Sequence, residues 1–239
     1  MSEKGIIVVL SGFSGAGKGT VLKALLDRYP DYALSVSCTT RAPREGEKNG
    51  VNYYFVTDEE FKNMIRENGF YEYACYTDCS YGTPRKYVDE KLAKGIDVIL
   101  EIEVQGAMQI KQQFPDTPLI FLTTPSAEVL RERLIGRGTE TMDKIRRRLA
   151  NAAREAKSIS AYDYLLINDS AERCAGDLHM IIRSEHEKAQ LKERGRFGPD
   201  RDRAAGIDAG IAHMRTDRNL DFIQKITEEV QTFKTKEEN

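Results

Sequence analysis

One stretch restricts the fold of this chain more than any other: a short apolar run, a glycine-rich loop and an amphipathic helix in direct succession. The run Ile6–Leu10 is continuous and mostly β-branched, as in a buried parallel strand. The loop Gly12–Thr20 follows, and then a helix with Val21 and Leu25 on its apolar face, which Pro30 ends. Glycines let a backbone turn its N–H groups toward a phosphate, and the helix N-terminus adds partial positive charge. The succession predicts a P-loop that binds a nucleoside triphosphate.

Lys18 lies where a P-loop lysine can reach the β- and γ-phosphates. Serine or threonine commonly follows that lysine and meets Mg²⁺, but here Gly19 follows it and Thr20 comes next. We predict Thr20 as a metal ligand, with its contact left open by this departure. The predicted nucleotide contacts are Gly12, Phe13, Ser14, Gly15, Ala16, Gly17, Lys18, Gly19 and Thr20. The alternative is a glycine-rich turn with a solvated lysine.

Strand and helix patterns alternate along much of the remaining chain. Further strands are predicted near Ala33–Cys38, Ile96–Ile102, Leu119–Thr123 and Tyr164–Ile167. Helices are predicted over Gln105–Phe114, after a cap at Ser126, over Met142–Ser158 and over Ala171–Arg194. Such alternation predicts an α/β fold, a parallel sheet with helices on both faces.

Two segments interrupt this alternation. From Thr39 to Lys86 tyrosines are dense, the stretch Asn52–Val56 predicts antiparallel strands, and Thr57 with Glu60 is a capping box. Near the C-terminus, a Gly- and charge-rich stretch over 195–214 reads as a loose loop. An amphipathic helix is predicted over 220–233. We expect that helix to pack on the core or on a second copy of the chain, which would make a homo-oligomer.

Composition excludes several classes of protein. The 239 residues carry a net charge of −2 and 40% hydrophobic residues, so a globular protein with no general attraction to nucleic acid or anionic membrane is expected. No apolar run approaches the roughly 20 residues of a membrane helix, and Ile6–Leu10 is too short for a secretory signal, so we expect a cytoplasmic protein. Cysteines 38, 75, 79 and 174 are expected to be reduced thiols, and none of the three histidines falls in a catalytic motif.

Several further motifs occur in a characteristic order. They are Ser37–Glu47 with two arginines three residues apart, Asn49–Phe55, Phe70–Ala74 and Tyr81–Pro84. Together with the P-loop they resemble guanylate kinase over about residues 4 to 190. The resemblance implies a P-loop parallel-sheet core, an inserted GMP-binding α+β subdomain and a helical lid. It also implies transfer of the γ-phosphoryl group of ATP to GMP with Mg²⁺, giving ADP and GDP.

The resemblance implies roles for individual residues on the acceptor side. Those that match the clamp on the GMP phosphate are Arg41, Arg44, Tyr53 and Tyr81, and those that match the guanine-reading groups are Ser37, Glu72 and Thr83. The chemistry agrees, since a guanidinium can fork onto a phosphate and a carboxylate can accept from both N1–H and the N2 amino group of guanine. Adenine presents the reverse pattern and would leave Glu72 badly paired.

On the donor side, Arg137 and Arg148 match the lid arginines that stabilise charge during transfer, with Lys18 and Arg41 as their catalytic partners. Asn168 matches a position beside the adenine ring. Two glutamates replace the family's usual aspartates after the buried strand. Glu101 is predicted to hold Mg²⁺, through water, and Glu103 to contact GMP.

The expected organisation has three parts. The core spans 4–36 and 87–194 with a lid over about 133–158, the inserted subdomain spans 37–86, and an extension spans 195–239. Two alternatives remain open: a guanylate-kinase-like module that binds without catalysis, and a P-loop kinase for another phosphorylated small molecule.

Overall fold

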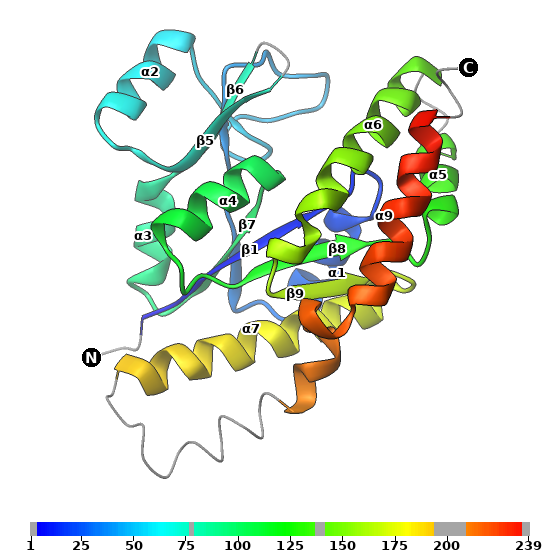
Figure 1. Ribbon diagram of the computed structural model, residues 1–239. Helices are drawn as coiled ribbons and strands as arrows, with labels where there is room; N and C mark the ends of the chain where they lie inside the picture. The colour runs from blue at the N-terminus through cyan, green and yellow to red at the C-terminus, as the bar shows by residue number, and fades with distance from the viewer. Residues whose placement is uncertain (1–3, 77–78, 137–141, 194–208, 236–239) are drawn as a thin grey trace. The chain divides into compact units, whose positions relative to one another are not determined.

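The computed structural model describes residues 4–76, 79–136, 142–193 and 209–235 (Figure 1). The chain divides into two compact units, one formed by Met1–Val9 and Asp31–Thr117 and the other by Leu10–Pro30 and Pro118–Asn239. Among the described residues, no helix is both long and apolar enough to cross a membrane. The domain boundaries expected from the sequence remain a prediction.

The main sheet has the strand order β2-β7-β1-β8-β9. In the first unit β2 (Tyr32–Leu34) pairs in parallel with β7 (Asp97–Glu101), and in the second β8 (Leu119–Thr123) pairs in parallel with β9 (Tyr164–Ile167). β1 (Ile7–Gly12) runs from the first unit into the second. Strand interiors such as Val9, Ile99 and Phe121 are fully buried, as expected for a parallel sheet. The predicted α/β class is confirmed, and β8 and β9 have the predicted bounds.

The prediction of one strand over Ala33–Cys38 is wrong. β2 ends at Leu34, and Cys38 begins β3 (Cys38–Thr39) in a second sheet. Both ends of the predicted strand carry apolar residues, but they pair with different strands. Leu34 lies opposite Ile99 of β7, and Cys38 lies opposite Gly82 in the second sheet. A pattern of side chains cannot reveal such a change of partner.

The second sheet lies in the first unit, in the order β4-β3-β6-β5. β6 (Cys79–Pro84) is antiparallel to both β3 and β5 (Phe70–Tyr76), as the sequence predicts for this segment. β4 (Tyr54–Phe55), however, is parallel to β3, so the prediction of an antiparallel strand over Asn52–Val56 is wrong. The intervening loop returns the chain to the end from which β3 started, which allows parallel pairing.

The predicted capping box at Thr57 is confirmed. The Thr57 hydroxyl accepts the N–H of Glu60 at 3.2 Å, and the Glu60 carboxylate accepts the N–H of Thr57 at 2.7 Å, which starts α2 (Asp58–Arg66). Phe61 of this helix stacks on Phe70, with ring centroids 4.5 Å apart. Phe61, Phe70 and Cys38 form the apolar core beneath the second sheet.

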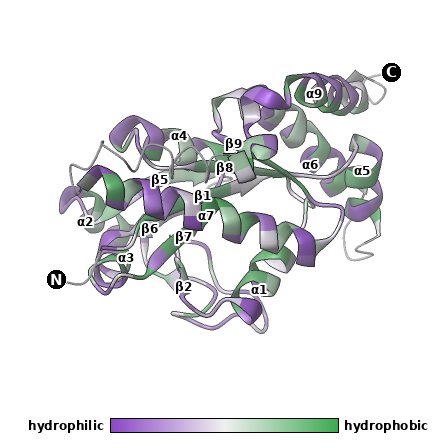
Figure 2. Cartoon of the chain, turned by 90° about the horizontal axis from the view of Figure 1, so that it is seen from below, coloured by the Kyte–Doolittle hydropathy of each residue, from purple (hydrophilic) through white to green (hydrophobic). Residues whose placement is uncertain are grey.

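The remaining predicted helices differ from prediction only at their ends, but α3 (Arg85–Leu92) was not predicted. The first unit holds α3 (Arg85–Leu92) and α4 (Val104–Gln113). The second holds α1 (Lys18–Arg28), α5 (Ala127–Ile135), α6 (Met142–Glu155), the 3-10 helix η1 (Ala156–Ala161) and α7 (Ala171–Glu193). Ser126 caps α5 by accepting the N–H of Val129, as predicted. Hydrophilic and hydrophobic positions alternate along these helices, as expected for helices with one buried face (Figure 2).

The described C-terminal residues, 209–235, hold more regular structure than the sequence suggests. Residues 195–208 lie outside the described part, but Ile211 and Met214 are buried, so a loose loop up to Met214 is wrong for its last residues. Two short 3-10 helices follow, η2 (Ala212–Met214) and η3 (Thr216–Arg218), and then α9 (Leu220–Thr235). The predicted amphipathic helix is confirmed, and it packs on α6 and η1 of its own chain (Figure 1).

Candidate functional site

The glycine-rich loop joins β1 to α1 in the second unit. Gly15 and Gly17 have φ angles of 95° and 94°, which side-chain-bearing residues rarely adopt. Phe13 is fully buried and meets the Phe121 ring edge-on, with centroids 5.0 Å apart. Phe13 therefore anchors the loop through its side chain, and only its backbone can meet a ligand.

Lys18 lies over this loop at the start of α1. Its Nζ donates to the carbonyl oxygen of Gly12 at 2.6 Å and to that of Phe13 at 3.3 Å. Gly19 and Thr20 follow on the exposed side of the first helical turn, and a Cβ at Gly19 would meet no atom within 4 Å. Packing therefore does not require glycine at position 19.

The side chains of Arg133 and Asn168 hold the glycine-rich loop through one of its backbone carbonyls. The carbonyl oxygen of Ala16 accepts hydrogen bonds from Arg133 Nη1 at 3.2 Å and from Asn168 Nδ2 at 2.7 Å. Arg133 Nη2 also donates to the backbone oxygen of Asn168 at 2.9 Å. Because the C=O and N–H of a trans peptide point in opposite directions, fixing this carbonyl turns the Gly17 N–H the other way. The two side chains thus orient the peptide between Ala16 and Gly17.

Sequence reasoning missed this role of Arg133, and it expected Asn168 beside the adenine ring. The structure places the Asn168 amide on the loop backbone, so its contact with adenine stays a prediction. No local pattern reveals either contact, since the partners lie more than a hundred residues apart.

A second arginine approaches the loop from α6. Arg148 Nη1 donates to the Ser14 hydroxyl at 2.8 Å, so this predicted lid arginine lies at the P-loop. The other predicted lid arginine, Arg137, lies outside the described residues.

In the first unit a buried acidic group lies between β5 and β6. The Thr83 hydroxyl donates to Glu72 Oε1 at 2.6 Å, and both residues are buried. Burial raises the pKa of Glu72, and the hydrogen bond from Thr83 opposes that rise. The predicted guanine-reading residues Glu72 and Thr83 are therefore brought together. Ser37 is half-buried at the start of β3, where its carbonyl accepts the N–H of Tyr54 at 2.9 Å.

Helix α4 approaches Glu72 closely at a glycine. The backbone N–H and C=O of Tyr73 pair with the side-chain amide of Gln109, at 3.2 and 2.8 Å, and this holds α4 against β5. As a result, a Cβ at Gly106 would lie 2.9 Å from Cδ of Glu72 and closer still to Oε2. Gly106 thus leaves the room that the carboxylate occupies, a function that sequence reasoning missed.

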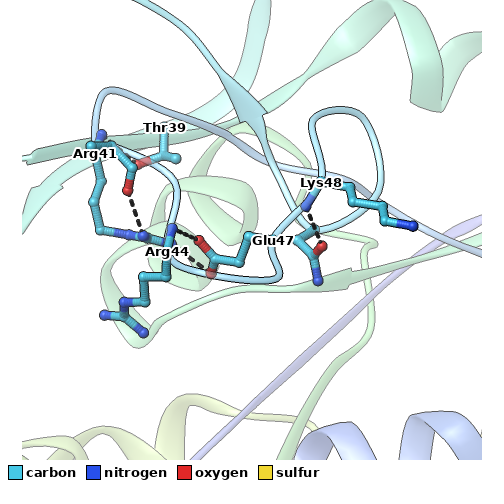
Figure 3. Close-up of polar contacts among 7 residues, drawn as sticks. Thr39, Arg41, Arg44, Glu47 and Lys48 are labelled. Carbon is cyan, nitrogen blue, oxygen red and sulfur yellow. Dashed lines mark hydrogen bonds and ion pairs between the residues drawn. The ribbon is translucent and has the colours of Figure 1, made fainter.

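The predicted phosphate clamp centres on Arg41 and Glu47 (Figure 3). Arg41 Nη2 donates to Glu47 Oε1 at 2.9 Å, and Glu47 Oε2 accepts the N–H of Arg44 at 2.7 Å. This hydrogen bond between Arg41 and Glu47 lowers the pKa of the Glu47 carboxyl group and raises the pKa of the Arg41 guanidinium. Glu47 closes this loop although no role was predicted for it. The sequence signal that could have indicated this role is an acidic residue only three positions after Arg44 and six after Arg41.

Aromatic rings surround the same guanidinium. The Arg41 Cζ lies 5.4 Å from the ring centroid of Tyr53, and the Tyr53 and Tyr81 rings meet edge-on at 6.0 Å. Burial raises the pKa of Tyr53, and the nearby Tyr81 adds to that rise. Three of the four predicted clamp residues thus lie together. The guanidinium of the fourth, Arg44, extends away from Glu47 (Figure 3).

The two predicted acidic residues after β7 have different settings. Glu101 is the last residue of β7 and lies near enough to Tyr53 to raise its pKa. Glu103 is the exposed residue that precedes α4, and its carbonyl accepts the N–H of Ala107. Within the described ranges, no three His, Cys, Asp or Glu side chains are close enough together to hold a metal ion.

A parallel sheet with a glycine-rich loop between its first strand and first helix, held by Arg133 and Asn168, defines a P-loop nucleotide-binding protein. The sequence model of the family "Guanylate kinase" matches residues 4–185. The chain therefore belongs to the guanylate kinase family.

Similar proteins agree with this assignment. The chain is 46% identical over 191 residues to a guanylate kinase of Listeria innocua, covering 80% of this chain and 93% of that protein. It is 50% identical over 187 residues to one of Latilactobacillus sakei, covering 78% and 92%. The crystal structure of guanylate kinase from Anaplasma phagocytophilum matches with a TM-score of 0.63 at 33% identity, covering 82% of this chain and 98% of that one.

Proposed function

We propose that this protein is a guanylate kinase that transfers the γ-phosphoryl group of ATP to GMP, giving ADP and GDP. The observation that carries the proposal is the buried pair of Glu72 and Thr83 in a chain that also has a complete P-loop. A P-loop by itself indicates only that the phosphoryl donor is a nucleoside triphosphate. A buried carboxylate beside a hydroxyl also selects the base of the nucleotide that accepts the phosphoryl group.

On the acceptor side, the Glu72 carboxylate accepts the N1–H and N2 amino hydrogens of guanine. Ser37 and Thr83 contribute hydroxyls near the O6 edge, and Glu103 contacts GMP from the start of α4. Arg41, Tyr53 and Tyr81 bind the GMP phosphate together with Arg44. Glu47 holds Arg41 through an ion pair whose side chains are only 16% and 18% exposed, which supports a preformed phosphate clamp.

On the donor side, the N–H groups of the loop over 12–20 surround the β- and γ-phosphates of ATP. Lys18, Arg137 and Arg148 neutralise the charge that spreads over the transferring group. Transfer of this kind depends on positioning and charge neutralisation more than on a general base. His179 stacks on Tyr29 with ring centroids 3.7 Å apart, which is a packing contact.

Mg²⁺ accompanies ATP in this proposal. The ion keeps several waters and takes phosphate oxygens, so it needs few protein ligands, and hydroxyl and carboxylate oxygens suit it. Thr20 on the first turn of α1 and Glu101 at the end of β7 supply these groups, Glu101 through water. When bound, the ion would withdraw negative charge from the triphosphate. The protein acts in the cytoplasm on ATP and GMP, without nucleic acid or membrane.

A coupled assay of ADP release with GMP, AMP, dTMP and UMP tests the proposal. GMP is expected to be the preferred acceptor by at least about 10²-fold in kcat/KM, because adenine leaves the buried Glu72 unpaired. A preference for AMP or dTMP would contradict it. Binding of GMP without any turnover would favour a non-catalytic module.

Gly106→Ala tests how closely α4 must approach Glu72. The added methyl displaces the carboxylate, so kcat/KM with GMP is expected to fall about tenfold or more. The melting temperature is expected to fall slightly, because the overlap at a buried site costs about 1–3 kcal/mol and the gain in helix propensity is only about 1 kcal/mol. Gly176→Ala in α7 is the matched control, since its Cβ meets no atom closer than 4.0 Å. An unchanged GMP affinity in Gly106→Ala would show that Glu72 does not read the base.

A further inference from the structure

The C-terminal segment, residues 209–235, lies outside the family match, which ends at residue 185. It is nevertheless built into the second unit. Thr216 donates its N–H to the backbone oxygen of Asp163 at 3.0 Å, next to β9. Ile223, Ile226 and Val230 of α9 are buried, and α9 runs along α6 and η1 (Figure 1).

A polar contact ties α9 to a second helix. Glu229 Oε2 accepts the backbone N–H of Ala127, the first residue of α5, at 3.1 Å. This N–H is among those that a helix leaves without an internal partner, and the carboxylate also complements the partial positive charge of the helix N-terminus. The C-terminal segment therefore contacts both α5 and α6.

Each of these two helices carries an arginine that reaches the P-loop. Arg133 on α5 donates to the Ala16 carbonyl, and Arg148 on α6 donates to the Ser14 hydroxyl. Leu149, directly after Arg148, is buried along with Ile145 on the same helix. The face of α6 that packs into the unit thus determines where Arg148 points.

We propose that α9 is a positioning element of the ATP half-site, by which we mean the P-loop over 12–20 together with Arg133 and Arg148. By packing on α6 and accepting the Ala127 N–H, it holds the two helices so that Arg133 and Arg148 stay at the P-loop. Glu229 is a positioning residue that acts on α5 and so through Arg133, and Ile226 is one that acts on α6 and so through Arg148. The effect of α9 on turnover rests on the proposed function. The effect of α9 on ATP binding does not, because ATP binding does not depend on which acceptor is used.

A purely stabilising role is the competing explanation, and a double-mutant cycle separates the two. Glu229→Ala in the full chain is expected to weaken binding of a non-hydrolysable ATP analogue about 3- to 10-fold, measured by calorimetry without any acceptor. In an Arg133→Ala background the same change is expected to have no further effect. Glu229→Gln keeps an acceptor oxygen and is expected to restore most of the affinity.

Glu228→Ala, one residue earlier on the exposed side of α9, is the matched control and should bind the analogue like the unaltered chain. Ile226→Ala tests the packing of α9 on α6 independently, and its effect on affinity should disappear in an Arg148→Ala background. The proposal would be overturned by a loss of equal size with and without the corresponding arginine, Arg133 for Glu229→Ala and Arg148 for Ile226→Ala. A lower melting temperature with unchanged analogue affinity would also overturn it. The expected coupling to both arginines with no phosphorylation of GMP would overturn the proposed function instead.

Discussion

Lys18→Ala is expected to lower kcat for phosphoryl transfer by about 10³-fold or more, the largest effect of any single substitution in the donor half-site. The lysine supplies a full positive charge at the loop that surrounds the β- and γ-phosphates, where transfer spreads negative charge over the oxygens. Its Nζ lies over the loop carbonyls of Gly12 and Phe13, which keeps the ammonium at the phosphate side. Steady-state rates with saturating GMP and varied ATP would measure the loss.

The GMP affinity of Lys18→Ala should stay unchanged, because Glu72 and Arg41 belong to the other compact unit. Lys23→Ala is the matched control. Lys23 lies on the same helix, forms an ion pair with Asp27 and is 75% exposed, so its loss should leave turnover intact. A Lys18→Ala variant that retained a tenth of the activity would show that Lys18 is not the principal donor-side charge.

Glu72→Gln is expected to remove the preference for GMP. The glutamine can still accept from Thr83, but its NH₂ group meets a guanine donor where a carboxylate oxygen accepted one. A mismatch of this kind between buried donors is expected to lower kcat/KM with GMP on the order of 10²- to 10³-fold, and much less with AMP. Glu67→Gln, at the exposed end of α2, is the control. Unchanged selectivity would mean that another group reads the base.

The stability of the same variant should move in the opposite direction from its activity. Burial raises the folded-state pKa of Glu72, so ionisation opposes folding, and stability is lost as the pH rises through the folded-state pKa. Glutamine carries no such charge. Thermal unfolding at pH 7 is therefore expected to show Glu72→Gln at least as stable as the unaltered chain, with the difference fading below the pKa of unfolded glutamate. A marked destabilisation at pH 7 would show that the charged form is favoured in the folded site.

Local patterns were sufficient where neighbours along the chain decide the structure. The strands over 119–123 and 164–167, the capping box at Thr57 and the cap at Ser126 depend on side-chain period and on hydrogen bonds within one turn. The P-loop belongs to this class too, since its strand, loop and helix are contiguous. The paired arginines and the tyrosines over 37–86 became informative through their order, which identifies the family.

The sequence by itself thus determined the α/β class, the P-loop and the family. The tertiary structure alone decided which sheet Cys38 joins, that β4 is parallel, and that Arg133 and Asn168 orient the Ala16 carbonyl. It also decided that Gly106 makes room for Glu72 and that Glu229 meets the start of α5. These features join residues far apart in the chain, and a side chain shows no preference for a distant partner until packing brings the two within hydrogen-bond or van der Waals distance.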